Sequence, residues 1–177
     1  HVRLESEKFQ GRKGTWIGYS VDDVLDEAVK RAKKEVEKRN PDADESFVQR
    51  AGESVGVGAF RYSLISSSPE KEVVFKWKEA LDFNRNSGPA VQYSHARASN
   101  ILRKAEESEM EPDNYCFEEE IENKLIMKLV KFPDVIKEAG ENLQPHKVAN
   151  YASELSLLFN KFYEVAPVLQ AENEELK

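Results

Sequence analysis

Gln92, Tyr93 and Arg97 place an amide, an aromatic ring and a guanidinium within six residues of the chain. Further round the same predicted helix lie Asn100 and Lys104. Aromatic rings and guanidinium planes stack on unpaired nucleobases, and amide groups form hydrogen bonds with base edges. Composition alone favours an ordinary amphipathic helix with a polar outer face, so both interpretations stay open at this point.

The helix that carries these side chains is predicted to begin near Asn86 or Ser87 and to end at about Glu107. Either residue can cap the first turn, and Pro89 fits a first-turn position, where its missing N–H group removes no hydrogen bond. A narrow stripe of mainly small residues at three- and four-residue spacing should face the core. The stripe consists of Val91, Ser94, Ala98, Ile101, Leu102 and Ala105.

A second group of residues with chemical potential lies near the N-terminus, where three cations and two glycines fall within eight residues. Its members are Lys8, Gly11, Arg12, Lys13 and Gly14. Glycine lets a backbone turn sharply and approach a ligand closely, so such a loop can hold phosphates. An exposed basic turn without a ligand explains the same residues.

The composition describes a strongly polar globular protein. Of the 177 residues, 40% are hydrophobic and 33% are charged, and Cys116 is the single cysteine. No apolar run reaches the roughly 18 residues of a membrane span, and one cysteine cannot form an internal disulfide or a zinc cluster. We therefore expect a cytoplasmic protein with no membrane partner.

The distribution of charge matters more than its sum. A net charge of −7 argues against binding that depends on phosphate neutralisation alone. Basic residues nevertheless cluster at 8–13, 30–39 and 95–104, whereas segment 106–122 is acidic and lacks basic side chains. A polyanion could therefore contact one side of the chain while the acidic segment faces water.

The rest of the chain is predicted to be mainly helical. Ser20 followed by Asp23 indicates a helix cap, and glycines at 52, 56 and 58 indicate close helix packing, because each costs about 1 kcal/mol relative to alanine. The segment Val73–Trp77 is ambiguous between a short strand and the start of a helix that reaches Phe83. Helices are expected at 20–39, 44–65, 117–131 and 134–140, and from Pro145 to before Pro167.

No catalytic set is evident from the residue pattern. His95 and His146 lie about 50 residues apart, and neither has a cysteine or carboxylate at metal-ligand spacing. We assign His95 to a helix surface and His146 to the first turn of a helix. The chain is therefore expected to contain no catalytic residue and no metal ligand.

Several blocks of the sequence resemble arginyl-tRNA synthetases, a family of class I aminoacyl-tRNA synthetases. The run Gly-Pro-x-x-Gln-Tyr-x-His-Ala-Arg at 88–97 is similar to the helix that opens the family's anticodon-binding domain. The basic loop at 8–14 resembles the family's Lys-Met-Ser-Gly-Arg-Lys-Gly signature. Leu-Ile-x-x-Leu-x-x-Phe-Pro at 125–133, Pro-His-x-x-Ala-x-Tyr at 145–151 and Phe-Asn-x-Phe-Tyr at 159–163 follow in the family's order.

This resemblance implies a mainly α fold in three parts. Residues 1–18 would be the end of a catalytic domain with its signature loop, 19–84 a helical connector of the stem-contact type, and 85–177 an anticodon-binding helical bundle of the class I synthetase type. We expect the chain to be a C-terminal fragment, with a segment before His1 and a bundle truncated at its C-terminus.

The resemblance also implies the activity of the parent enzyme, which is ligation of arginine to its tRNA with ATP and Mg²⁺, by a monomer. The fragment itself is expected to bind no cofactor and to catalyse nothing alone. By resemblance, the ATP loop is Lys8, Gly11, Arg12, Lys13 and Gly14, and the tRNA-binding residues are Gln92, Tyr93, Arg97 and Tyr163. The two tyrosines would stack on anticodon bases, and Arg97 would read or clamp the loop. The alternative is a freestanding helical protein-interaction module without catalysis.

Overall fold

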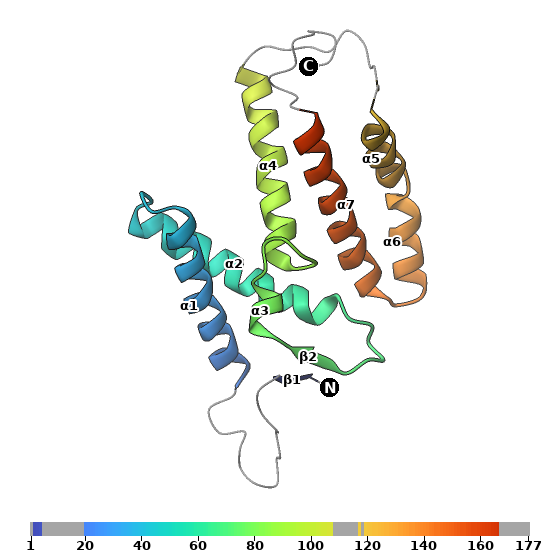
Figure 1. Cartoon of the computed structure of the whole chain (residues 1–177). Coiled ribbons are helices and arrows are strands. Elements are labelled where there is room, and N and C mark those ends of the chain that lie inside the picture. The colour runs from blue at the N-terminus through green and yellow to red at the C-terminus, as the bar shows by residue number, and fades with distance from the viewer. Residues whose placement is uncertain (1, 5–19, 108–116, 118, 167–177) are drawn as a thin grey trace. The chain divides into compact units, whose positions relative to one another are not determined.

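The computed structural model describes residues 2–4, 20–107, 117 and 119–166, and these are mainly helical (Figure 1). The chain divides into two compact units, His1–Ala90 and Val91–Lys177. Among the described residues, no helix combines the length and the apolar character that a membrane crossing requires.

The first unit contains a pair of helices, α1 (Val21–Arg39) and α2 (Glu45–Ile65). The predicted cap of α1 is confirmed, because the Ser20 hydroxyl accepts a 3.1 Å hydrogen bond from the backbone N–H of Asp23. The Asp23 carboxylate in turn accepts a 2.7 Å bond from the backbone N–H of Ser20. Each of these two hydrogen bonds satisfies a backbone N–H group that has no acceptor within the helix.

Glycines of α2 let the two helices approach closely, as the sequence predicts. A Cβ atom on Gly56 would lie 2.6 Å from the Cα atom of Val29, and one on Gly52 would lie 2.3 Å from Cγ of Lys33. The later glycine of α2, Gly56, faces the earlier residue of α1, Val29, so the two helices are antiparallel. At Gly56 the two backbones are too close for any side chain larger than the hydrogen atom of glycine.

The ambiguous segment after α2 contains both of the predicted elements. Strand β2 (Val73–Phe75) pairs in parallel with β1 (Val2–Leu4), with Val2 opposite Val73. The helix α3 (Trp77–Ala80) then follows, and it ends before the predicted Phe83. The ring of Phe75 is 2% exposed and meets the Trp77 ring edge-on at a centroid distance of 4.9 Å.

The helix α4 (Gly88–Glu107) begins where the sequence predicts. The hydroxyl of Ser87 accepts a 3.2 Å hydrogen bond from the backbone N–H of Ala90, which caps the first turn. A Cβ atom on Gly88 would lie 2.7 Å from the carbonyl oxygen of Gly58. The start of α4 therefore rests directly on the backbone of α2.

The second unit is a bundle that consists of the rest of α4 with α5 (Glu120–Val130), α6 (Phe132–Glu141) and α7 (Pro145–Val165). The helix α7 lies between α4 and the α5–α6 pair (Figure 1). The start of α5 lies three residues after the predicted Phe117. The predicted interruption between the helices at 117–131 and 134–140 is present, since α5 ends at Val130 and Lys131 forms the turn. However, α6 begins at Phe132, two residues before the predicted Asp134, because Pro133 occupies its first turn, where proline is tolerated.

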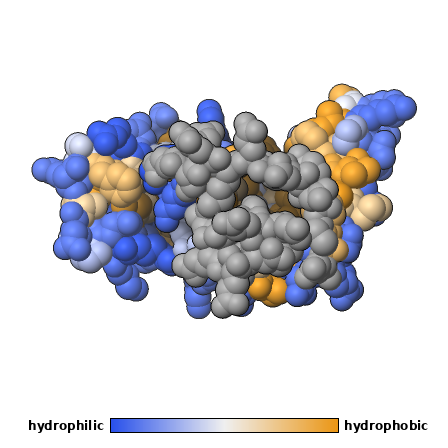
Figure 2. Space-filling view, turned by 90° about the horizontal axis from the view of Figure 1, so that it is seen from above, coloured by the Kyte–Doolittle hydropathy of each residue, from blue (hydrophilic) through white to orange (hydrophobic). Residues whose placement is uncertain are grey.

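The predicted core stripe of α4 is only partly correct. Ser94 is 4% exposed, whereas Leu102 is 64% exposed. Leu102 directly follows Ile101, and consecutive helical residues point about 100° apart, so both cannot face the same core. Hydrophobic side chains are also exposed on α5 and α6, and Figure 2 shows hydrophobic surface on the right of the view, where these helices lie.

Candidate nucleic-acid interface

Tyr93, Arg97 and Tyr163 form one cluster across α4 and α7. The Cζ atom of Arg97 lies 4.6 Å from the ring centre of Tyr93 and also 4.6 Å from the ring centre of Tyr163. Tyr93 and Arg97 are four residues apart, so they share one face of α4, and α7 supplies Tyr163. The structure therefore brings together three of the sequence-predicted site residues.

The aromatic rings of this cluster are open to solvent. Tyr93 is 44% exposed and Tyr163 is 41% exposed, while Arg97 is half-buried. Within the part of the chain that the structure describes, Arg97 forms no ion pair with a carboxylate, and its charge is not neutralised locally. A cation held over ring faces and left without a counter-ion suits a ligand that offers both π surfaces and negative charge.

Hydrogen bonds fix the position of the guanidinium. Arg97 donates through Nη2 to the Tyr93 hydroxyl at 3.1 Å and through Nη1 to Oδ1 of Asn160 at 3.3 Å. Asn160 also donates through Nδ2 to the Ser94 hydroxyl at 3.0 Å. The sequence-based prediction that Ser94 faces the core is confirmed by its 4% exposure. It gave no role to Asn160, because no short sequence pattern links position 160 to positions 94 and 97.

Gln92 and His95 lie outside these contacts. Gln92 is half-buried and lies about 100° round the helix from its neighbour Tyr93. His95 is exposed, as predicted for a residue of the helix surface. A base-contacting role for Gln92 stays a prediction.

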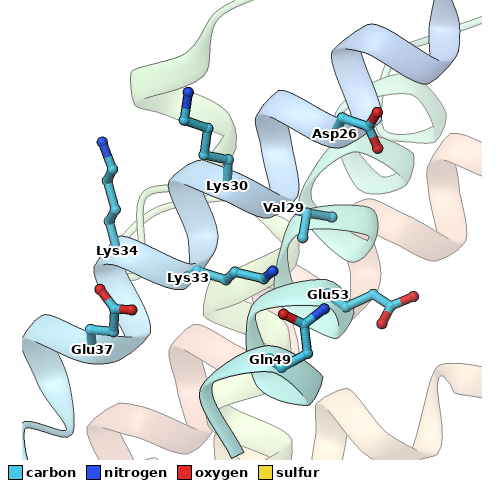
Figure 3. A pocket seen from close by; sticks show the side chains of 8 residues that line it. All are labelled: Asp26, Val29, Lys30, Lys33, Lys34, Glu37, Gln49 and Glu53. Carbon is cyan, nitrogen blue, oxygen red and sulfur yellow. The ribbon is translucent and has the colours of Figure 1, made fainter. Parts of the chain in front are cut away.

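The first unit carries a separate basic surface on α1. An open depression of about 550 Å³ lies between α1 and α2, where Lys33 extends toward Gln49 and Glu53 (Figure 3). Lys30 and Lys34 are exposed on α1 and point away from α2 in the same view. Carboxylates of α1 and α2 also line the depression, so it does not select an anion by net charge. Lys30 pairs with Glu27 at 3.9 Å, so exposed Lys34 is the stronger candidate for phosphate contact.

The predicted ATP loop lies outside the described residues, since its members are Lys8, Gly11, Arg12, Lys13 and Gly14. In residues 2–4, 20–107, 117 and 119–166, no group of three or more histidine, cysteine, aspartate and glutamate side chains could hold a metal ion.

Family models match consecutive parts of the chain. The model described as tRNA synthetases class I (R), catalytic domain, matches residues 3–77, and the model described as DALR anticodon binding domain matches residues 91–177. The cluster of Tyr93, Arg97 and Tyr163 lies inside the second match. Together these matches define part of a class I aminoacyl-tRNA synthetase that includes sequence of its catalytic and anticodon-binding domains.

Arginine-tRNA ligase from Pyrococcus abyssi is 46% identical over 176 residues, which is 97% of this chain and 28% of that protein. The ligase of the same name from Methanococcoides burtonii is 44% identical over 181 residues, which is 99% of this chain and 32% of that protein. The chain belongs to the arginyl-tRNA synthetase family. It spans less than a third of the length of these relatives.

Solved structures show the same relationship. The chain is similar to the arginyl-tRNA synthetase of Thermus thermophilus with a TM-score of 0.81 and 34% identity, over 99% of this chain and 30% of that one. The arginyl-tRNA synthetase of Plasmodium falciparum gives a TM-score of 0.72 and 25% identity, over 89% of this chain and 28% of that one. The predicted fold class, a mainly α protein with a helical bundle of the class I synthetase anticodon-binding type, is confirmed.

Proposed function

We propose that residues 85–177 bind the anticodon loop of an arginine-specific tRNA, within an enzyme that ligates arginine to that tRNA with ATP and Mg²⁺. The cluster of Tyr93, Arg97 and Tyr163 carries this proposal, because two exposed rings converge on one surface with a cation that pairs with no carboxylate of the described residues. The match of residues 91–177 to an anticodon-binding domain supports it. The same match disfavours the alternative, a freestanding protein-interaction module.

The binding mechanism follows from the chemistry of the three side chains. Anticodon bases are unpaired, so their faces can stack on the rings of Tyr93 and Tyr163, and each stacked base contributes about 1–3 kcal/mol. The charge of Arg97 attracts the phosphates of the loop, and its guanidinium lies where it can contact a base or a phosphate. Stacking supplies affinity for single-stranded RNA, and the cation orients the loop.

The remaining parts of the chain would support this contact. We assign residues 1–18 to the end of the catalytic domain, where the basic loop would hold the phosphates of ATP, and residues 19–84 to a connector that contacts the tRNA stem. Lys34 on α1 is exposed and suited to phosphate contact. We further propose that the enzyme acts as a cytoplasmic monomer.

Titration with tRNA tests the proposal. The 177-residue chain is titrated with a transcript of arginine tRNA and with a transcript whose anticodon is altered, at two salt concentrations. We expect tighter binding of the unaltered transcript and a fall in affinity as salt rises, because phosphate contacts release counter-ions. Absent, equal or salt-insensitive binding would contradict anticodon recognition and favour the interaction module.

Substitutions at the cluster sharpen the test. Arg97→Ala should weaken binding of arginine tRNA by about 1–3 kcal/mol if the side chain makes a specific contact. Tyr163→Ala should cost a similar amount, whereas Tyr163→Phe, which keeps the ring, should bind nearly as well as the parent. If Arg97→Ala and Tyr163→Ala both bind like the parent, the cluster is only a surface feature.

A further inference from the structure

Asn160 connects the two helices of the candidate interface through one carboxamide. Its Oδ1 atom accepts a 3.3 Å hydrogen bond from Nη1 of Arg97, and its Nδ2 atom donates a 3.0 Å bond to the hydroxyl of Ser94. Both partners lie on α4, whereas Asn160 lies on α7, one turn before Tyr163. The carboxamide of Asn160 makes its hydrogen bonds with Arg97 and Ser94, so its link to the ring of Tyr93 runs through Arg97.

We propose that Asn160, anchored by Ser94, is a positioning residue that holds the guanidinium of Arg97 between the rings of Tyr93 and Tyr163. This inference rests on the proposed function, since it explains how the nucleotide-binding surface is kept in shape before RNA arrives. In this account Asn160 does not touch RNA. Its role is to make the two tyrosines, which come from different helices, a single preorganised platform.

The need for such a residue follows from the flexibility of arginine. An arginine side chain has several rotatable bonds, and a cation–π contact at an exposed site is too weak to select one conformation by itself. A guanidinium presents its donors in a fixed plane, so an acceptor on its edge sets the orientation of that plane. Asn160 and the Tyr93 hydroxyl both accept at this edge, and the plane can then meet both rings.

Ser94 fixes which end of the Asn160 carboxamide faces Arg97. Arginine has donors only, so the carboxamide must present its oxygen to Arg97 and its NH₂ group to Ser94. Ser94 is 4% exposed, and a buried hydroxyl holds its partner more firmly than one that competes with water. The direction of both hydrogen bonds, from Arg97 to Asn160 and from Asn160 to Ser94, therefore follows from the donors and acceptors of these side chains.

Side-chain NMR tests this inference without RNA. In the chain labelled with ¹⁵N-arginine, the Nε–Hε signal of Arg97, assigned with Arg97→Lys, should show a restricted side chain. In Asn160→Ala the order parameter of that signal should fall toward the value of a free arginine, and in Ser94→Ala it should fall by a smaller amount. Arg31, whose Cζ atom lies 4.6 Å from the Trp77 ring, serves as the internal control and should not change.

A double-mutant cycle on tRNA binding separates positioning from packing. Asn160→Ala should weaken binding of the arginine tRNA transcript about five-fold, as expected for loss of one hydrogen bond. In the Arg97→Ala background the same substitution should change binding less than about two-fold, because residues that act through one another are not additive. Ser94→Ala provides the same comparison if Asn160→Ala does not fold.

The outcomes distinguish this inference from the proposed function. Equal losses from Asn160→Ala in both backgrounds, or an unchanged Arg97 signal in Asn160→Ala, would overturn the positioning role and leave anticodon binding intact. Unchanged tRNA binding in Arg97→Ala and Tyr163→Ala would overturn the proposed function and with it the platform. A fall in the order parameter of the Arg97 Nε–Hε signal, together with non-additive effects of the two substitutions on tRNA binding, supports the inference.

Discussion

The hydroxyl of Tyr151 donates a 2.8 Å hydrogen bond to the carbonyl oxygen of Lys128, 23 residues earlier in the chain. The ammonium group of Lys128 also lies 4.8 Å from the centre of the same ring and pairs with Glu154. Tyr151 is 5% exposed. One buried tyrosine therefore ties α5 to α7 within the bundle, on a different helix pair from the one that carries the candidate interface.

Tyr151→Phe should lower the free energy of unfolding by about 1 kcal/mol, because it removes one part-buried hydrogen bond and keeps the ring. Urea unfolding measures this change. Tyr163→Phe is the matched control, and at its exposed position it should change the free energy of unfolding by less than about 0.5 kcal/mol. Equal effects of the two substitutions would mean that the bond to Lys128 does not stabilise the bundle.

Gly56→Ala should destabilise the first unit even though alanine is the better helix former. The new Cβ atom would lie 2.6 Å from the Cα atom of Val29, so the helices would have to move apart, at a cost of about 1–3 kcal/mol. Gly140→Ala is the control, since a Cβ atom there meets nothing within 4 Å and should stabilise α6 by about 0.5–1 kcal/mol. In thermal unfolding, Gly56→Ala should lower the Tm of the chain and Gly140→Ala should raise it.

The cap of α1 predicts a pH dependence. Hydrogen bonds from the side chain and backbone of Ser20 hold the pKa of the Asp23 carboxyl below its ordinary value of 3.8. Because the folded-state pKa is lowered, the cap stabilises the helix fully above about pH 3.8 and loses its effect as the pH falls through the folded pKa.

An NMR titration of the Asp23 carboxyl carbon tests this account. In Ser20→Ala the pKa of Asp23 should rise toward its ordinary value, since the hydroxyl that stabilises the carboxylate is gone. The pKa of Asp44, which is lowered by bonds to Ser46 and to the backbone of Phe47, should stay where it is. A pKa of Asp23 that did not move would assign the effect to another group.

Lys34→Ala should reduce the salt dependence of tRNA binding if α1 contacts the phosphate backbone. Each phosphate contact that is lost lowers the slope of log K against log salt by about 0.9. Lys137→Ala on α6 removes an exposed lysine that the proposal does not use and is the matched control. Equal slopes for these two variants would argue against a stem contact at Lys34.

Local features of the fold were predictable from the sequence. The Ser20 cap, the Ser87 cap and the close approach at Gly56 each depend on neighbouring residues or on one residue type, and each is present. The start of α6 was placed two residues late, because Pro133 was taken as a helix break although proline also fits a first turn. The start of α5 was placed three residues early, at Phe117 instead of Glu120.

The candidate site was predictable only in part. Tyr93 and Arg97 share a helix face by spacing, but the pairing with Tyr163 came from resemblance, since no periodic pattern links positions on separate helices. Asn160 was missed for the same reason, because its hydrogen bonds span 63 and 66 residues of sequence. Contacts of that range are set by how helices pack, which short sequence patterns do not encode.

The shared guanidinium also limits how many nucleotides the surface can hold. A tyrosine ring has two faces, and Arg97 occupies one face of Tyr93 and one face of Tyr163. Each ring thus keeps at most one other face for a nucleobase, so in the proposed complex no more than two bases can stack on these rings at once. In the proposed complex, a third letter of the triplet would therefore be contacted without stacking on these rings, for example by Arg97, or by another part of the enzyme.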